Sequence, residues 1–197
     1  MDTITKNEMQ TILSIVKSPE MMYNANNLAK VLEITSMGTL KILKKLEQEL
    51  ILKSKQIGKA RIYRINLDDD YSKNYINLLL SREALHSSPQ IKRWASELKK
   101  IKHADLIILF GSVLDKKEPN DIDVLFVTEQ KNFKKLKDEI KELNQINVKN
   151  VHPVYQSKED LILNIKEKDK VILNAIKGIF IKGENNFLEV YDESRKE

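Results

Sequence analysis

Two aspartates and a Gly-Ser pair near the middle of the chain are the residues best suited to chemistry. Asp121 and Asp123 open one apolar run, and Gly111-Ser112 closes the apolar run before it. Short apolar runs between turn signals predict buried strands, and residues i and i+2 of a strand share a face. We therefore expect the two carboxylates to lie side by side, where a divalent cation such as Mg²⁺ would offset their repulsion.

Gly111 and Ser112 suit the other half of such a site, because glycine lets the backbone approach a phosphate and a helix starting there would aim its N–H groups at the anion. The whole pattern resembles the signature of the nucleotidyltransferase superfamily that includes DNA polymerase beta and the minimal nucleotidyltransferases. The resemblance covers about residues 103–185. It implies transfer of a nucleoside monophosphate from an NTP with Mg²⁺ or Mn²⁺. Asp121 and Asp123 would be the catalytic metal ligands, and Gly111 and Ser112 would bind the nucleotide.

Two features depart from the family pattern. The loop from 113 to 120 has eight residues, which is shorter than in the family. The strand predicted over 148–155 contains no acid, whereas the family has a third carboxylate there. His152 lies at that position, either as a ligand or base in place of the carboxylate or simply as a residue at a strand end.

These departures leave three functions open for the domain. An active enzyme would modify an acceptor, and because similar minimal nucleotidyltransferases act as antitoxins, a toxin-like protein is one candidate acceptor. An inactive domain would only bind a nucleotide or support a dimer. The third alternative is an RNA-modifying nucleotidyltransferase that grips structured RNA.

Strand and helix patterns alternate through this part of the chain. Apolar runs predict strands over 106–110, 121–127, 148–155 and 179–183, the last of which closes the predicted pattern. Amphipathic helical patterns lie between the second strand and the last. The order suits the small mixed α/β sheet of a minimal nucleotidyltransferase.

Positive charge is concentrated in the N-terminal third of the chain. Residues 1–67 carry 11 Lys/Arg and 6 Asp/Glu, a net of +5, whereas residues 68–197 carry 23 of each. Such asymmetry indicates a basic module joined to a neutral one. We divide the chain accordingly into a basic domain over 1–67, a helical linker or dimerisation region over 68–102, and the nucleotidyltransferase-like domain over 103–197.

The basic module has the periodicities of three helices and a hairpin. Apolar residues recur at helical spacing over 9–16, 25–32 and 40–50, and a strand pattern follows. Ser36 is the expected N-cap of the third helix, and Leu50 is expected to face inward. This order resembles the winged helix-turn-helix of bacterial and archaeal regulators of the MarR and ArsR types.

The resemblance implies that the third helix enters the major groove of double-stranded DNA while the hairpin, or wing, meets phosphates or the minor groove. The candidates for DNA contact are Ser36, Met37, Thr39, Lys41, Lys44 and Lys45 on the helix, and Lys53, Lys55, Lys59 and Arg61 on the wing. The alternative is a solvated basic face that packs against protein or binds RNA.

The remaining features narrow the class of protein. A composition of 41% hydrophobic and 32% charged residues is typical of a globular protein, and the lack of cysteine excludes disulfides and thiolate zinc sites. No apolar run approaches the length of a membrane span. A helix over 71–85, apolar on more than one side, either bridges the domains or pairs with its copy. We expect a cytoplasmic homodimer of the α+β class that regulates transcription.

Overall fold

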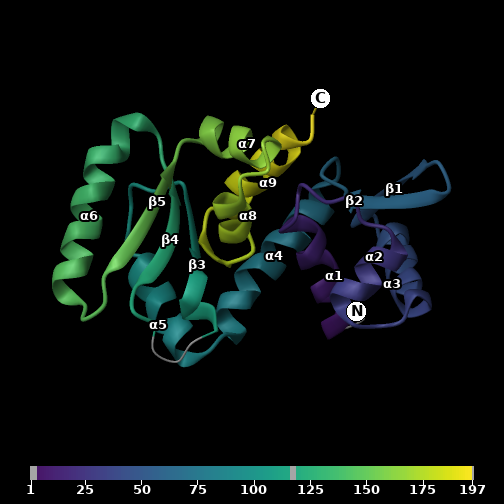
Figure 1. Cartoon of the computed structure of the whole chain (residues 1–197), viewed down its shortest axis with the longest axis horizontal. Helices are drawn as coiled ribbons and strands as arrows, with labels where there is room; N and C mark the ends of the chain where they lie inside the picture. Colours follow the sequence, from purple (N-terminus) through teal and green to yellow (C-terminus); the bar gives the residue numbers. More distant parts are fainter. Residues whose placement is uncertain (1–3, 116–118, 197) are drawn as a thin grey trace. The chain divides into compact units, whose positions relative to one another are not determined.

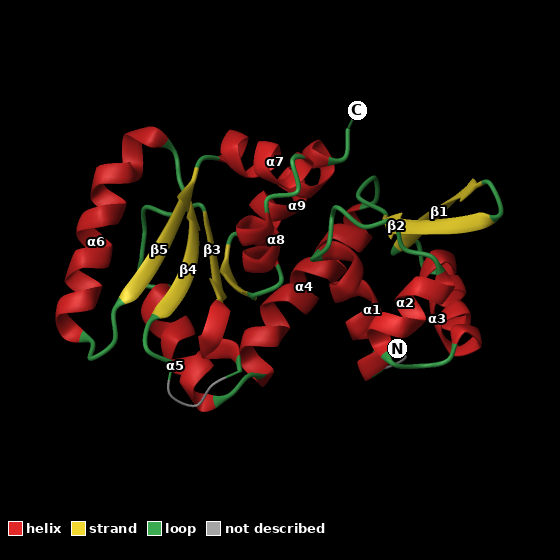
Figure 2. Ribbon diagram, in the orientation of Figure 1, coloured by secondary structure: helices red, strands yellow, loops and turns green. Residues whose placement is uncertain are grey.

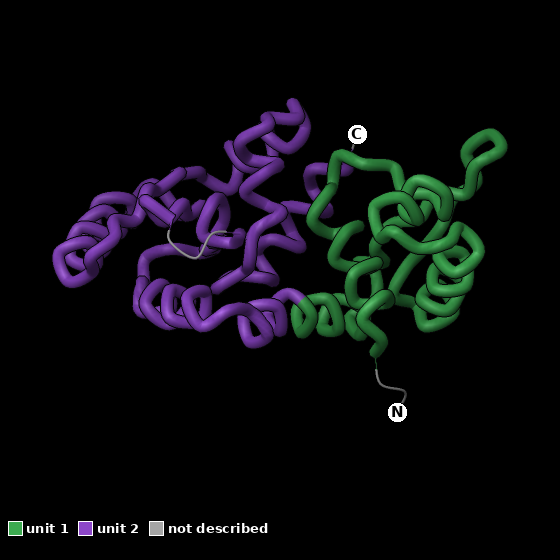
Figure 3. The backbone as a smooth tube through the Cα atoms, turned by 60° about the horizontal axis from the view of Figure 1, so that its bottom comes forward, with its two compact units in different colours: residues 1–79 green, residues 80–197 purple. Residues whose placement is uncertain are grey.

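The computed structural model describes residues 4–115 and 119–196. The chain divides into two compact units, Met1–Leu79 and Leu80–Glu197 (Figure 3). The helix α4 (Asp70–His86) crosses this division. Within the described ranges, no helix is both long and apolar enough to cross a membrane.

Unit 1 begins with three helices, which are α1 (Lys6–Val16), α2 (Ala25–Leu32) and α3 (Ser36–Gln48) (Figure 1). Asn24 caps α2 through its side-chain oxygen, which accepts the N–H groups of residues 26 and 27. The cap of α3 is Thr35 and not Ser36 as predicted, because the extended Thr35 accepts the Gly38 N–H. Ser36 is therefore the first residue of the helix.

The expectation that Leu50 faces inward is wrong. Leu50 has a positive φ of 61° and is 57% exposed, because α3 has ended and the chain turns sharply there. The fully buried residue at this corner is Ile51. Helical periodicity cannot be extended through such a turn, so the buried position moves by one residue.

The wing of unit 1 is the antiparallel pair β1 (Leu52–Ile57) and β2 (Ala60–Ile65), joined by a two-residue turn. Tyr23 forms an isolated bridge to Tyr63, whose N–H donates to the Tyr23 carbonyl over 2.8 Å. A single bridging residue leaves no periodicity in the sequence, so this third piece of the sheet was not predicted. Three helices followed by this hairpin give unit 1 the topology of a winged helix-turn-helix (Figure 2).

A buried carboxylate connects the first and third helices. Glu8 Oε1 accepts a hydrogen bond from Lys45 Nζ over 2.7 Å, and Glu8 Oε2 accepts one from the Thr5 N–H over 2.7 Å. Burial raises the pKa of the Glu8 carboxyl, but these donors outweigh it and hold the pKa below its ordinary value. The interaction fixes the start of α1 against α3.

Unit 2 is built on a four-stranded mixed sheet. Its strand order is β5-β4-β3-β6, in which β3 is antiparallel to β4 and β6 while β4 and β5 are parallel. The strands are β3 (Leu106–Phe110), β4 (Ile122–Val127), β5 (Val151–Gln156) and β6 (Ile179–Lys182). The predicted strands over 121–127 and 148–155 thus begin later, and Val148 lies almost fully exposed in the loop before β5.

Helices cover the sheet, and the short helix η1 (Gly111–Leu114) follows β3. Trp94 and Leu98 of α5 join Leu136 and Ile140 of α6 in one core with alternate residues of the strands. Phe187 of α9 packs edge-on against the ring of Phe180 in β6. The helices are α5 (Pro89–Leu98), α6 (Phe133–Ile146), α7 (Lys158–Lys166), α8 (Lys170–Ile176) and α9 (Glu184–Ser194).

We predict that Glu8→Gln lowers the free energy of unfolding of unit 1 by roughly 1–2 kcal/mol at pH 7, because the charged bond to Lys45 is lost. The wild-type contribution of Glu8 should be complete above the unfolded-state pKa, about 4.3. It should disappear as the pH falls through the lower folded-state pKa. Urea unfolding at pH 7 and in acid measures both effects.

The matched control is Glu33→Gln, at an exposed position after α2. It should unfold like the wild-type chain at both pH values. A Glu8→Gln variant that also does so would show that the buried bond does not stabilise the fold.

Candidate functional site

An exposed stripe of residues runs along α3. Met37, Lys41, Lys44 and Gln48 are all exposed at spacings of four, three and four residues, which places them on one side of the helix. The opposite side is buried through Leu43 and Leu46. Ser36 is also exposed, at the first position of the helix. Ser36, Met37, Lys41 and Lys44 were among the candidates for DNA contact, whereas Gln48 was not.

Two of the predicted contact residues on α3 are otherwise engaged. Thr39 is fully buried, and its hydroxyl donates to the Thr35 carbonyl over 3.1 Å. Lys45 is bound to Glu8, with Glu49 at 3.8 Å. Thr39 is therefore not placed to reach a base, and the charge of Lys45 is compensated within the domain.

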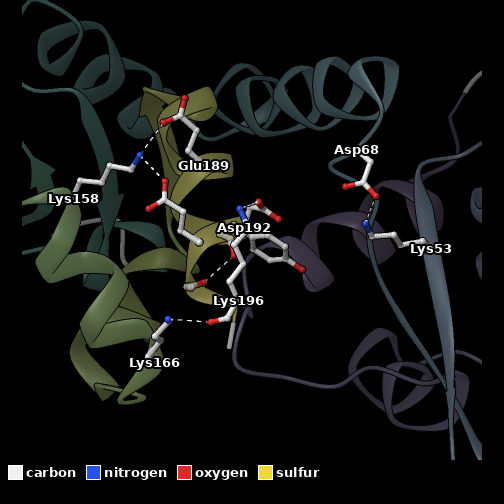
Figure 4. Close-up of polar contacts among 10 residues, drawn as sticks. Lys53, Asp68, Lys158, Lys166, Glu189, Asp192 and Lys196 are labelled. Atoms are coloured by element: carbon white, nitrogen blue, oxygen red, sulfur yellow. Dashed lines mark hydrogen bonds and ion pairs between the residues drawn. The ribbon is translucent and has the colours of Figure 1, made fainter.

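The outer face of the wing carries most of its cations. Lys53 is paired in register with Arg64, and Lys55 follows Lys53 by two residues, so the three side chains share one face. Lys59 lies exposed in the turn. Lys53 forms a 2.5 Å ion pair with Asp68 (Figure 4). The hydrogen bond from Lys53 holds the pKa of the Asp68 carboxyl below its ordinary value.

Arg61 lies on the opposite face of the wing from the other three. Its guanidinium donates to Ser54 over 2.6 Å and to Glu47 over 2.9 Å, and Ser54 donates to Glu47 over 2.5 Å. This network joins the wing to the end of α3. Arg61 therefore has a structural partner, and the outward cation of β2 is Arg64, which the sequence analysis did not name. Period-two alternation from the buried Tyr63 would have indicated it.

In unit 2 the Gly-Ser turn and one of the two aspartates meet. Gly111 has a φ of +73°, and a Cβ atom there would overlap the carboxylate of Asp123. Asp123 is paired in register with Phe110 on one side and His152 on the other. The distance from Asp123 Oδ1 to His152 Nδ1 is 3.2 Å. Gly111, Asp123 and His152 thus form one polar cluster at the end of the sheet, and Ser112 follows in η1.

Asp121 does not belong to this cluster. It is exposed in the bend before β4, so the rule that residues i and i+2 of a strand share a face does not apply to it. Across 4–115 and 119–196, no group of three or more His, Asp or Glu side chains is placed to hold a metal ion. One carboxylate beside an imidazole does not match the oxygen-rich donor set of Mg²⁺. The loop over 113–120 lies partly outside the described residues.

Comparisons with known proteins gave solved structures only. No family model matches the chain, and no curated protein matches it significantly. A variant of ZitR from Lactococcus lactis is 14% identical with a TM-score of 0.35, over 51% of this chain and 64% of that one. The match thus spans less than two thirds of the ZitR variant.

Two further matches are similar in extent. MepR, a transcription regulator of the Staphylococcus aureus multidrug efflux pump MepA, is 14% identical with a TM-score of 0.36, over 49% of this chain and 76% of that one. Another ZitR variant, in complex with DNA, is 13% identical with a TM-score of 0.30, over 50% and 75%. Likeness at this level decides neither fold nor function, which rest on the geometry of the two units.

We predict that Gly111→Ala lowers the stability of unit 2 by about 1–3 kcal/mol, because it adds backbone strain and an overlap with Asp123. The control is Gly58→Ala in the wing turn, where φ is +57° but no atom lies within 4 Å of the added Cβ. It should cost about 1–2 kcal/mol through strain alone. Urea unfolding followed by Trp94 fluorescence and circular dichroism measures both, and no loss of stability in Gly111→Ala would show that the turn tolerates a side chain.

Proposed function

We propose that unit 1 binds double-stranded DNA and that the chain is a transcription regulator. The observation that carries the proposal is the exposed stripe of α3, with Lys41 and Lys44 beside Met37 on the second helix of a helix-turn-helix. A helix of this kind fits the major groove, where its first residues reach base edges. Lysines further along the stripe are suited to phosphates.

Uncompensated charge supports the same function. Among the described residues, Lys41, Lys44, Lys55, Lys59 and Arg64 form no ion pair. Their charges are available to phosphates, and such contacts release counterions from DNA. The proposed contact set is therefore the α3 stripe with the outer face of the wing, without Thr39, Lys45 and Arg61.

A homodimer is part of the proposal, since paired half-sites require paired readers. On the part of α4 that belongs to unit 1, Tyr71 and Leu78 are exposed and lie seven residues apart, a spacing suited to helix pairing. The stoichiometry of DNA binding tests the homodimer, because a dimer places two chains on each duplex. One chain per duplex would contradict it.

We predict that Lys41→Ala and Lys44→Ala each weaken DNA binding roughly three- to tenfold and lower the slope of log affinity against log salt by about one. Fluorescence anisotropy with a labelled duplex pool at several salt concentrations measures both quantities. The matched control is Lys141→Ala, an exposed lysine on α6 of unit 2 that forms no ion pair among the described residues.

Two outcomes would contradict the proposal. One is an affinity that does not depend on salt, which would exclude the basic face as the contact surface. The other is stronger competition by duplex RNA than by duplex DNA, which would favour the RNA-binding alternative.

A second function is favoured for unit 2 by one specific observation, the packing of Asp123 against the left-handed Gly111. We propose that this turn binds the phosphates of an NTP. Asp121 lies outside the cluster, so Asp123 would be the carboxylate that contacts a divalent cation, Mg²⁺ or Mn²⁺, and the phosphates of the nucleotide would supply further oxygen ligands. A metal bound with the nucleotide would supply charge neutralisation, and the imidazole of His152 would orient the Asp123 carboxylate.

Transfer of the nucleoside monophosphate to an acceptor, including a protein acceptor such as a toxin, is the active form of this proposal. Binding without transfer is the inactive form. The described residues supply no third carboxylate beside Asp123, which favours the inactive form. Turnover of an NTP in the presence of metal separates the two.

We predict that calorimetric titration of each NTP with Mg²⁺ or Mn²⁺ gives binding that Asp121→Ala/Asp123→Ala abolishes. The control is Asp138→Ala/Glu142→Ala, two exposed acids on α6. It should bind like the wild-type chain. An unchanged affinity in the Asp121→Ala/Asp123→Ala variant would exclude the site, and the absence of binding in every variant would make unit 2 a scaffold.

A further inference from the structure

The wing projects beyond the helices of unit 1 (Figures 1 and 3). At its base, the bridge between Tyr23 and Tyr63 joins β2 to the segment before α2. The outer half of the hairpin, from Ser54 to Arg61, pairs with no further strand within the described ranges. Because a two-stranded hairpin alone is marginally stable in water, side-chain contacts decide where this half lies.

One carboxylate supplies such contacts, that of Glu47 near the end of α3. Its Oε1 accepts hydrogen bonds from the Ser54 hydroxyl over 2.5 Å and from Arg61 Nη2 over 2.9 Å. Its Oε2 accepts a hydrogen bond from the same Arg61 nitrogen over 3.2 Å. Since Ser54 belongs to β1 and Arg61 to β2, Glu47 binds both strands of the wing.

The geometry of this contact differs from that of an ordinary surface ion pair. Isolated exposed pairs contribute little, because both side chains lose conformational freedom and water screens their charges. The Glu47 side chain is only 26% exposed and accepts from two donors at once. The Arg61 guanidinium also lies 5.9 Å from the centre of the ring of Tyr63, a buried residue. The contact therefore holds the wing in one position relative to α3.

A carboxylate at this place requires an explanation in a domain proposed to bind DNA. Glu47 lies within one turn of Lys44 and Gln48, two residues of the exposed stripe of α3. A negative charge so close to the phosphates of a duplex would repel them. The presence of Glu47 is explained if its bonds to the wing favour binding more than its charge opposes it.

We propose that Glu47 is a positioning residue of the DNA interface, acting through Ser54 and Arg61. It holds the wing where Lys55 and Lys59 reach phosphates of the duplex that α3 enters. A wing that is already in place loses less conformational freedom on binding, which preserves affinity. The inference rests on the proposed DNA binding by unit 1 and adds a role for a residue that does not touch DNA.

The test is fluorescence anisotropy of the full chain with a labelled duplex pool at about 0.15 M salt. Glu47→Ala should weaken binding roughly three- to tenfold, although it removes a negative charge. Arg61→Ala should weaken binding by a similar factor. The double variant should bind no more weakly than either single variant, because both changes release the same wing.

The matched control is Glu33→Gln, which removes a negative charge at an exposed position after α2. It should bind as tightly as the wild-type chain or slightly more tightly. Urea unfolding of each variant without DNA shows whether it is folded under the conditions of the assay.

A second readout separates positioning from a loss of stability. Lys55→Ala should weaken binding in the wild-type chain but have little effect in the Glu47→Ala chain, because a released wing no longer presents Lys55 to the phosphates. A change in stability alone would leave the effect of Lys55→Ala the same in both chains.

Unchanged or tighter binding by Glu47→Ala would overturn the proposal, because Glu47 would then only repel DNA while the released Arg61 contacts phosphates. Additive effects of Glu47→Ala and Lys55→Ala would also overturn it. Both results would leave DNA binding by unit 1 intact. A wild-type chain that binds no duplex would instead overturn DNA binding itself, and the role of Glu47 with it.

Discussion

The burial of β3 and β4 on both faces is the constraint on which the sites of unit 2 depend. Ile108 and Leu125 are as fully buried as Leu109 and Val124, so neither face of these strands can carry a polar group along its length. Buried polar groups without partners are costly, which confines them to the strand ends. Asp123 lies at one end of β4, and Thr128 follows the other.

The cations of unit 1 also fall into two groups, those with an ion-pair partner inside the domain and those without one among the described residues. Lys45 and Arg61 are bound to Glu8 and Glu47, and these bonds connect α1 with α3 and α3 with the wing. Such pairs compensate charge that a ligand could otherwise use. The cations available to the proposed DNA interface are those that form no ion pair among the described residues, such as Lys44 and Lys55. Fixing α3 in the domain and supplying charge to the proposed DNA interface are therefore tasks of different residues.

Local sequence patterns determined much of this protein. The unbroken apolar run of 106–110 predicted β3, since no polar residue interrupts a strand buried on both faces. The spacing of Met37, Lys41 and Lys44 predicted the exposed stripe of α3, because helical geometry alone brings residues four and three apart to one side. The cap at Asn24 also followed from local chemistry.

Only the tertiary structure decided what depends on partners distant in sequence. Lys45 and Lys44 are alike as residues, yet Lys45 meets Glu8, 37 positions away. The helix α9 is an exception, because it was not predicted although the local spacing of Phe187, Leu188 and Tyr191 is helical. A cavity at the end of the sheet away from Asp123 combines segments from residues 105 to 190, and no local pattern can show which distant segments meet there. Packing, which depends on the whole chain, determines which charges are compensated and which remain available to bind a ligand.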